Sequence, residues 1–356
     1  MPTSKALRLS LLIATGLAVS LAAPPASALK YAEVEHHLKV DPSIPEWVPG
    51  PLEVQPEEEF NLVGADVMDE ITLGWVKLMR QAYPKLSVTM EARASGAGAP
   101  GLINGVAHAA PVGREMLPAE EKAFVEKFGY KPFAIKVATG SVGSLGKTAS
   151  SIILVDKANP IKGLTLAQLD AIYSTSRKRG LPDISKWGDL GLKGEWADRP
   201  IHLYGLKPPN GIESFFQQKV MEDGTYKTNI QFVKGQGFTH AFTVAAHDMA
   251  EHPGGLTYAL MANLTPDVRV VPLAEKEGQP FVMPTVETVY SHQYPLSRYV
   301  YIYVNKAPGK ALEAKTKEFL KAVLSRQGQD VVAKEGVYIP LTPDVVKEEL
   351  AKLDQQ

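Results

Sequence analysis

The apolar positions of this chain first follow a regular pattern near residue 60. The run from Phe60 to Gly64 predicts a short strand. Apolar residues then recur at helical spacing, at Ile71, Trp75, Leu78, Met79 and Ala82. A second strand with alternating apolar positions and a further helix are expected next, at Leu86 to Met90 and at Pro100 to His108. A strand, a helix and a strand in succession favour a right-handed parallel crossover in an α/β sheet.

The same succession returns in the middle of the chain. A helix is expected at Leu164 to Tyr173, a strand at Ile201 to Gly205 and a helix at Ile212 to Met221. Glycine, serine and small apolar residues fill the stretch between these two α/β units, Phe133 to Val155. The succession therefore predicts a second α/β unit, separated from the first by a linking segment.

Two further elements close the chain back on the first unit. Tyr299 to Val304 predicts a strand that returns the chain, and Ala311 to Leu324 predicts an amphipathic helix packed on the first unit. We therefore expect an α/β protein of two lobes, each a mostly parallel sheet flanked by helices, joined by two crossover strands. Residues 58–148 and 298–356 would form lobe 1, and residues 149–297 lobe 2.

The amino terminus predicts a cleavable signal peptide over residues 1–28. Lys5 and Arg8 precede the apolar run Leu9 to Ala23, and Ala26-Ser27-Ala28 provides a small-residue cleavage site. The apolar run is too short for a membrane anchor, which needs roughly 20 residues. The proline-rich residues 29–57 predict an extended arm on or beside lobe 1. The adjacent histidines of this arm, His36-His37, are interpreted as solvated side chains.

The amino-acid composition limits the cellular compartments and the kinds of binding partner that we expect. The chain has no cysteine, which excludes disulfides and a lipidated cysteine, so a soluble periplasmic protein is expected. Loss of Lys5 and Arg8 with the signal peptide leaves 36 basic residues against 39 acidic ones, a net charge of −3. This balance indicates neither a nucleic-acid partner nor membrane insertion of the mature chain.

Two loops of the first unit are candidate ligand sites, because α/β sheets bind ligands where a strand passes into a helix. In the first, Asp66 and Asp69 are expected foremost as helix caps, with ligand contact as the alternative. In the second, Ser95, Gly96 and Ala97 offer backbone N–H groups and a hydroxyl to an anion. A simple tight turn explains the second loop equally well.

Two other segments would face the same cleft. Asn210 is expected as the N-cap of the following helix, whereas Gly211 and Ile212 would offer backbone N–H groups to a ligand. Gly113-Arg114 would bring a guanidinium for a bidentate oxyanion contact, and an inter-lobe salt bridge is the slightly favoured alternative.

Patterns for catalysis or metal binding are weak. The spacing of His240, His247 and His252 matches no zinc motif, and Ser141 to Gly146 is no Gly-x-Ser-x-Gly nucleophile elbow. No phosphate-loop lysine motif is present either. We therefore expect a protein without enzymatic activity, metal or cofactor, and a phosphatase is the least favoured alternative.

Several longer segments together resemble one family. They are Ile161 to Leu169, Trp187 to Leu190, Tyr294 to Pro308 and Leu324 to Pro340. With the loops above they make the chain similar to PstS-type phosphate-binding proteins, the periplasmic receptors of phosphate ABC importers. The similarity covers nearly the whole mature chain. It implies the type II periplasmic binding-protein fold, a monomer, and an ABC permease as partner.

The resemblance also implies a small anionic ligand, phosphate or a relative, held between the lobes. The implied ligand contacts are Asp66, Val67, Ser95, Gly96, Ala97, Gly113, Arg114, Leu206, Asn210, Gly211 and Ile212. In the family's loop that matches residues 206–212, its Arg, Ser and Thr fall on Leu206, Asn210 and Ile212. Each buried hydrogen bond that is left unmet costs about 1–3 kcal/mol. These replacements favour a weaker or different ligand, such as one with an apolar part. The alternative function is a diverged module that serves as sensor, scaffold or protein partner in the cell envelope without phosphate transport.

Overall fold

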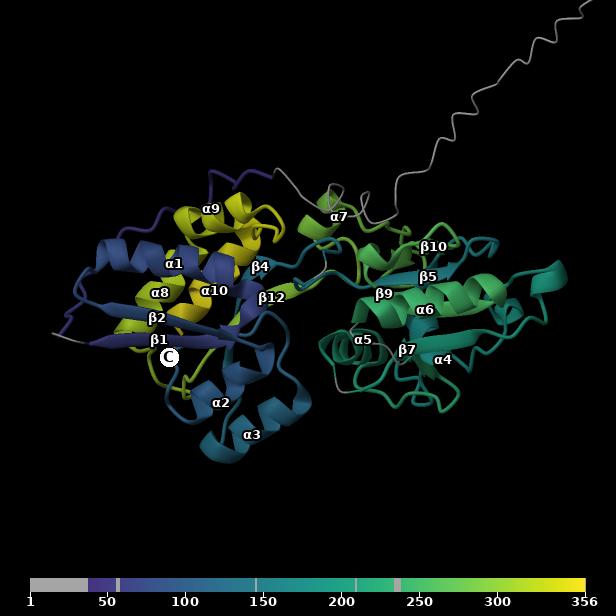
Figure 1. Cartoon of the computed structure of the whole chain (residues 1–356), viewed down its shortest axis with the longest axis horizontal. Coiled ribbons are helices and arrows are strands. Elements are labelled where there is room, and N and C mark those ends of the chain that lie inside the picture. Colours follow the sequence, from purple (N-terminus) through teal and green to yellow (C-terminus); the bar gives the residue numbers. More distant parts are fainter. Residues whose placement is uncertain (1–37, 56–57, 145, 209, 234–237, 356) are drawn as a thin grey trace, which may run out of the picture.

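The computed structural model describes residues 38–355 except 56–57, 145, 209 and 234–237. Two α/β bodies lie side by side and are connected near their middle (Figure 1). The predicted signal peptide and His36-His37 fall outside the described residues. In the described part of the chain, no helix is both long and apolar enough to cross a membrane.

Lobe 1 combines the amino-terminal half of the α/β pattern with the carboxyl-terminal helices. Its elements are β1 (Glu59–Ala65), α1 (Asp69–Ala82), β2 (Ser87–Arg93), α2 (Gly98–Ile103), β3 (Ala110–Pro111), α3 (Pro118–Phe128), β4 (Phe133–Thr139), β12 (Tyr299–Val304), α8 (Ala314–Leu324), α9 (Arg326–Glu335) and α10 (Pro343–Leu353). β1 pairs with β2 in parallel, and β12 lies antiparallel between β3 and β4. A bridge between Leu62 and Ala109 links the two groups of strands.

Lobe 2 is built around a five-stranded sheet of order β10-β5-β9-β7-β8. Its elements are β5 (Ile152–Asp156), β6 (Leu164–Thr165), α4 (Leu166–Tyr173), β7 (His202–Leu206), α5 (Gly211–Met221), β8 (Gln231–Val233), α6 (Phe238–Glu251), β9 (Gly255–Ala259), β10 (Val268–Val270), β11 (Leu273–Ala274) and α7 (Val286–Tyr290). β7 is parallel to β8 and β9, whereas β5 is antiparallel to β9 and β10.

The α/β class is confirmed, and the sheets contain more antiparallel pairing than the expected mostly parallel arrangement. In both lobes the antiparallel pairs involve the strands that run into or out of the crossover segments, β4, β5 and β12. The segment that leaves lobe 1 after β4 and the segment that enters β12 are hydrogen-bonded to each other: Gly140 N donates to Arg298 O at 2.8 Å and Ser151 N to Leu296 O at 3.2 Å. The two connections between the bodies therefore run together.

Each body has its own apolar core. Phe60, Trp75 and Phe319 are fully buried in the lobe 1 cluster, and Trp187 and Phe216 in the lobe 2 cluster. Complete burial of such a side chain stabilises the fold by about 1.5–3 kcal/mol relative to exposure. Separate cores of this kind are typical of two domains that are joined by linking segments.

Several helix ends differ from the sequence-based expectations. The helix expected to reach His108 ends at Ile103, because Gly105 adopts a left-handed φ of 69° just beyond it. The helix expected from Ala311 begins at Ala314. The sequence pattern had not indicated α10, which adds a last layer to lobe 1.

The described part of the arm, residues 38–55, packs against lobe 1 from Val40 onward, whereas Leu38 packs against the lobe 2 core. Ile44 is 1% exposed and belongs to the lobe 1 core. The Trp47 indole Nε1 donates to Glu318 Oε2 at 3.2 Å, and Arg326 N donates to Pro45 O at 2.8 Å. The arm thus lies against α8 and the start of α9 (Figure 1).

Candidate functional site

A cleft of about 450 Å³ lies where the two lobes face each other. This volume is within the range of small-molecule sites in proteins. Its lining residues come from both lobes and from the connection between them: Val67, Ala94, Ser95, Gly96, Arg114, Leu117, Gly146, Lys147, Thr148, Ala149, Asn210, Gly211, Ile212, Leu260 and Arg298.

Arg114 is the central charged group of the lobe 1 wall. Its Nη1 donates to Glu120 Oε2 and its Nη2 to Glu120 Oε1, both at 2.8 Å, and Nη1 also donates to the Glu115 carbonyl at 2.9 Å. Glu120 belongs to α3 of the same lobe, so the expected inter-lobe salt bridge of Arg114 is wrong. The end of the guanidinium is occupied and its orientation is fixed, while the Nε edge bonds no group in the described part of the chain.

The loop after β1 approaches the cleft through its backbone rather than through its aspartates. Gly64 is required there, because a Cβ atom at this position would lie 2.0 Å from the Pro111 carbonyl oxygen. Val67 lines the cleft, but Asp66 is exposed and accepts a hydrogen bond from Val67 N at 3.0 Å. Asp69 likewise accepts from the next backbone N–H, that of Glu70. Neither aspartate occupies an N-cap position, so the expected capping role is wrong.

The loop after β2 contributes small groups to the cleft. Ser95 and Gly96 line it at a single 3-10 turn that runs into α2. Ala97 of the same turn is not among the lining residues, because it packs against the small apolar cluster beneath α2 and α3. This loop therefore leaves room and one hydroxyl donor on the lobe 1 wall.

The start of α5 forms the opposing wall. The Asn210 side chain accepts from Ile212 N at 3.0 Å and from Glu213 N at 2.9 Å, which confirms its role as N-cap. A Cβ atom at Gly211 would lie 2.8 Å from Arg114 Cδ. The two walls therefore meet here, and only glycine permits this approach.

Leu206 does not line the cleft, contrary to the expectation from the family's loop. It ends β7, is 4% exposed and packs in the lobe 2 core. Gly113 is also absent from the lining; its carbonyl accepts a hydrogen bond from the Thr148 hydroxyl. Of the sequence-predicted residues, the cleft brings together Val67, Ser95, Gly96, Arg114, Asn210, Gly211 and Ile212.

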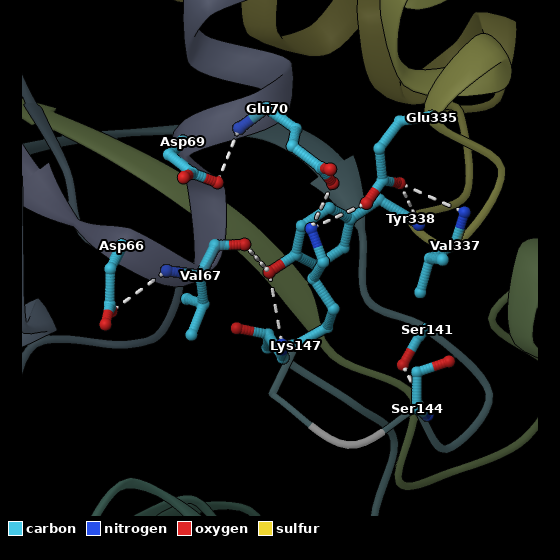
Figure 2. A network of polar contacts seen from close by, with 11 residues as sticks. Asp66, Val67, Asp69, Glu70, Ser141, Ser144, Lys147, Glu335, Val337 and Tyr338 are labelled. Carbon is cyan, nitrogen blue, oxygen red and sulfur yellow. Dashed lines mark hydrogen bonds and ion pairs between the residues drawn. The ribbon is translucent and has the colours of Figure 1, made fainter. Parts of the chain in front are cut away.

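The connection between the lobes supplies residues that sequence reasoning missed. Figure 2 shows Lys147 reaching over the Tyr338 ring, with its Nζ 2.8 Å from both Glu70 and Glu335. Burial disfavours the charged form of Lys147, but its bonds to Glu335 and Glu70 outweigh that effect and raise its pKa. The lysine is therefore a fixed cation, held by α1 and the end of α9.

The side chain of Tyr338 connects this segment to the loop after β1 through hydrogen bonds. Tyr338 Oη accepts a hydrogen bond from Thr148 N at 3.1 Å and donates to Val67 O at 3.0 Å (Figure 2). The loop after β1 and the crossover segment are thus held in a common geometry. The only sequence signal for this segment was its run of glycine and small residues.

The residues that the structure describes contain no group of three or more His, Asp or Glu side chains placed to hold a metal ion. His247 and His252 lie at the exposed end of α6, near Glu251 and Asp248 respectively. The His240 side chain lies outside the described part.

Comparison with known proteins agrees with this architecture of two lobes around a cleft. A family model described as a PBP superfamily domain matches residues 53–327. The phosphate-binding protein PstS of Pseudomonas aeruginosa is 35% identical over 320 residues, which cover 88% of this chain and 92% of that protein. The PstS protein of Staphylococcus aureus is 26% identical over 291 residues, 81% of this chain and 79% of that protein. The chain therefore belongs to the PBP superfamily and, within it, to the PstS family.

Solved structures support the fold. An ABC-type phosphate transport receptor from Vibrio cholerae superimposes with a TM-score of 0.50 at 19% identity, covering 79% of this chain and 99% of that one. PstS from Borrelia burgdorferi gives a TM-score of 0.51 at 16% identity, covering 80% of this chain and all of that one. The two-lobed binding-protein fold expected from the sequence is confirmed.

Proposed function

We propose that this protein is an exported solute-binding protein that takes phosphate or a related small oxyanion into its cleft and presents it to an ABC permease. The observation that carries this proposal is the fixed guanidinium of Arg114 at the point where the two walls meet. Glu120 holds one end of the group, and the Nε edge is left for a ligand oxygen. The names of the PstS relatives support the same ligand class.

The arrangement of two cores and paired connections supports a receptor that opens and closes. The lobes, with the boundaries expected at 148/149 and 297/298, would part about the paired crossover segments and close over the ligand. The process is binding and release without bond chemistry. We propose that the mature chain begins after residue 28, acts in the periplasm as a monomer, and needs no cofactor.

The test is calorimetric titration of the mature protein with inorganic phosphate, and with sulfate as a second oxyanion. Arg114→Gln removes a charge-assisted pair of donors, and we expect at least about a 30-fold loss of affinity. Arg93→Gln is the matched control, because Arg93 is exposed and its only ion pair within the described residues is with the neighbouring Glu91. Equal affinities of the wild-type protein and Arg114→Gln would refute the assigned site.

One observation favours a second candidate function. The Asn210 carboxamide already binds the backbone N–H groups of Ile212 and Glu213, and Val67 and Leu260 line the cleft with apolar groups. A cleft this poor in donors on one side suits a module that senses or binds another envelope protein. Absence of anion binding in the titration, together with specific capture of one envelope protein, would favour this function over transport.

A further inference from the structure

Arg298 lies where the two connections between the lobes run side by side. It directly precedes β12, and its carbonyl accepts a hydrogen bond from Gly140 N of the other connection at 2.8 Å. Its side chain lines the cleft, as does that of Arg114. The family's four ligand loops do not include this position, and the sequence-based site did not contain it.

The Arg298 guanidinium bridges the two lobes. Its Nη2 donates to Glu115 Oε2 at 2.6 Å on lobe 1, while its Cζ lies 4.5 Å from the centroid of the Phe215 ring on α5 of lobe 2. The residue is 4% exposed in this arrangement. In this arrangement the ring of Phe215 covers one face of the guanidinium.

One donor of this buried cation has no partner. The Arg298 Nε is enclosed and bonds no group within the described part of the chain. Buried donors are nearly always satisfied, and an unmet donor on a charged group is especially costly. The hydroxyls of Ser150, Ser151 and Ser297, on the same two connections, are likewise buried without partners. Of these unmet groups, only Arg298 belongs to a residue that lines the cleft, so its Nε is the donor that a ligand in the cleft could satisfy.

We propose that Arg298 is a second anion-binding residue of the cleft, whose Nε–H donates to an oxygen of the oxyanion that Arg114 also binds. This inference rests on the proposed function. It adds a contact from the connections between the lobes to the contacts from the loops. Arg298 would supply a donor opposite the cleft position where Ile212 offers no side-chain hydrogen bond. A ligand bound to Arg298, on one of the two connections, would also favour closure of the lobes. It would stabilise the arrangement in which Phe215 covers the guanidinium.

The test compares substitutions at the two ends of the Arg298–Glu115 ion pair. Arg298→Lys keeps the positive charge and the pairing with Glu115 but lacks the Nε donor. We expect its affinity for inorganic phosphate to fall about 10-fold or more, with a melting temperature close to that of the wild-type protein. Glu115→Gln leaves Arg298 in place, and we expect wild-type or tighter binding.

The outcomes separate a binding role from a structural one. If Arg298 acted only as the partner of Glu115, Glu115→Gln would weaken phosphate binding as much as the arginine substitutions do. That result, or unchanged affinity in Arg298→Lys, overturns the inference while wild-type binding leaves the proposed function standing. Wild-type protein that binds neither phosphate nor sulfate overturns both. Arg298→Gln serves as a second variant, with a larger expected loss because it also removes the charge.

Discussion

The two walls of the cleft are built on opposite principles. On lobe 1, Arg114 is held by Glu120, and Ser95 lines the same cleft from a turn of small residues. On lobe 2, the side-chain oxygen of Asn210 is already occupied in capping α5. Gly211 and Ile212 bring an apolar surface close to Arg114. In the proposed function, lobe 1 would therefore recognise the ligand and lobe 2 would close over it.

The proposed division of roles fits the preorganisation of Arg114 on lobe 1. The Arg114 side chain has already lost its rotational freedom to Glu120 and the Glu115 carbonyl, so binding costs little additional ordering. The lobe 2 wall would need only a shape that fits against Arg114. Gly211 provides this shape, because it has no side chain to collide with Arg114 Cδ. Substitutions on the two walls should therefore differ in kind: lobe 1 changes should alter rigidity and recognition, and lobe 2 changes should alter closure.

The largest expected effect concerns the rigidity of lobe 1. Tyr338→Phe removes the hydroxyl that joins Thr148 N to Val67 O, so the buried Thr148 N and the part-buried Val67 O both lose this partner. We expect a loss of about 2 kcal/mol in the free energy of unfolding, measured with urea. Tyr130→Phe is the control, because its hydroxyl bonds the Asn305 side chain in an exposed position and should cost little. Equal losses in both variants would show that the bridge does not stabilise the wall.

Closure by lobe 2 is tested with a pair of glycines, one from each wall. Gly211→Ala places a methyl group 2.8 Å from Arg114 Cδ, whereas the nearest atom to a new Cβ at Gly96 is 3.7 Å away. Because Arg114 is fixed at its far end, we expect Gly211→Ala to weaken phosphate binding about 10-fold, or roughly 1.4 kcal/mol. Gly96→Ala should leave the affinity close to that of the wild-type protein. Calorimetric titration of both variants decides whether the close approach limits binding.

The sequence predicted the frame of this site better than its details. Strand and helix periodicity located β1, α1, β2, β7, α5 and β12 within a few residues. Arg114 and Asn210 could be placed because a strand-to-helix loop faces the cleft in an α/β lobe. The expected place of Leu206 in the cleft was wrong. Successive residues of a strand point to opposite faces of the sheet, so a shift of one residue decides whether the last side chain enters the core or the cleft.

Lys147 and Arg298 could not be predicted from local pattern. Their roles depend on partners far along the chain, Glu335 for the lysine and Glu115 for the arginine. Nothing near either residue in the sequence indicates which carboxylate it will meet. Tertiary ion pairs of this kind become visible only once the two connections are placed side by side.

A smaller effect is expected from restoring a donor to the lobe 2 wall. Ile212 lines the cleft at the start of α5, where the resembling family has threonine. Ile212→Thr adds a hydroxyl without lengthening the side chain, and we expect phosphate to bind about 5-fold more tightly, near 1 kcal/mol. Ile212→Val keeps the branched shape without a hydroxyl and should give no gain. A gain in the valine variant would attribute the effect to space rather than to hydrogen bonding.

The last contrast between the lobes concerns two buried glutamates. Burial penalises the charged form of both. In lobe 1, Lys321 and other hydrogen-bond donors outweigh that penalty and lower the pKa of Glu318. In lobe 2, Glu213 lies 2% exposed in the first turn of α5, and burial raises its pKa above the ordinary value of 4.5, against a smaller opposing effect of Ser214. Among the described residues no cation forms an ion pair with Glu213.

These opposite shifts give opposite dependences of stability on pH. A raised carboxyl pKa means that the folded state binds the proton more tightly, so Glu213 destabilises the fold as pH rises above 4.5. A lowered pKa means that Glu318 stabilises the fold above 4.5 and loses that contribution as pH falls through its folded value. Glu213→Gln should therefore raise the melting temperature by about 1 °C at pH 8 and by less at pH 4, since up to about 1 kcal/mol corresponds to roughly 1–2 °C in a protein of this size. Glu318→Gln should lower it at pH 8 and approach the wild-type value at acid pH. Parallel pH profiles for the two variants would show that the carboxylates of the two lobes do not differ in this way.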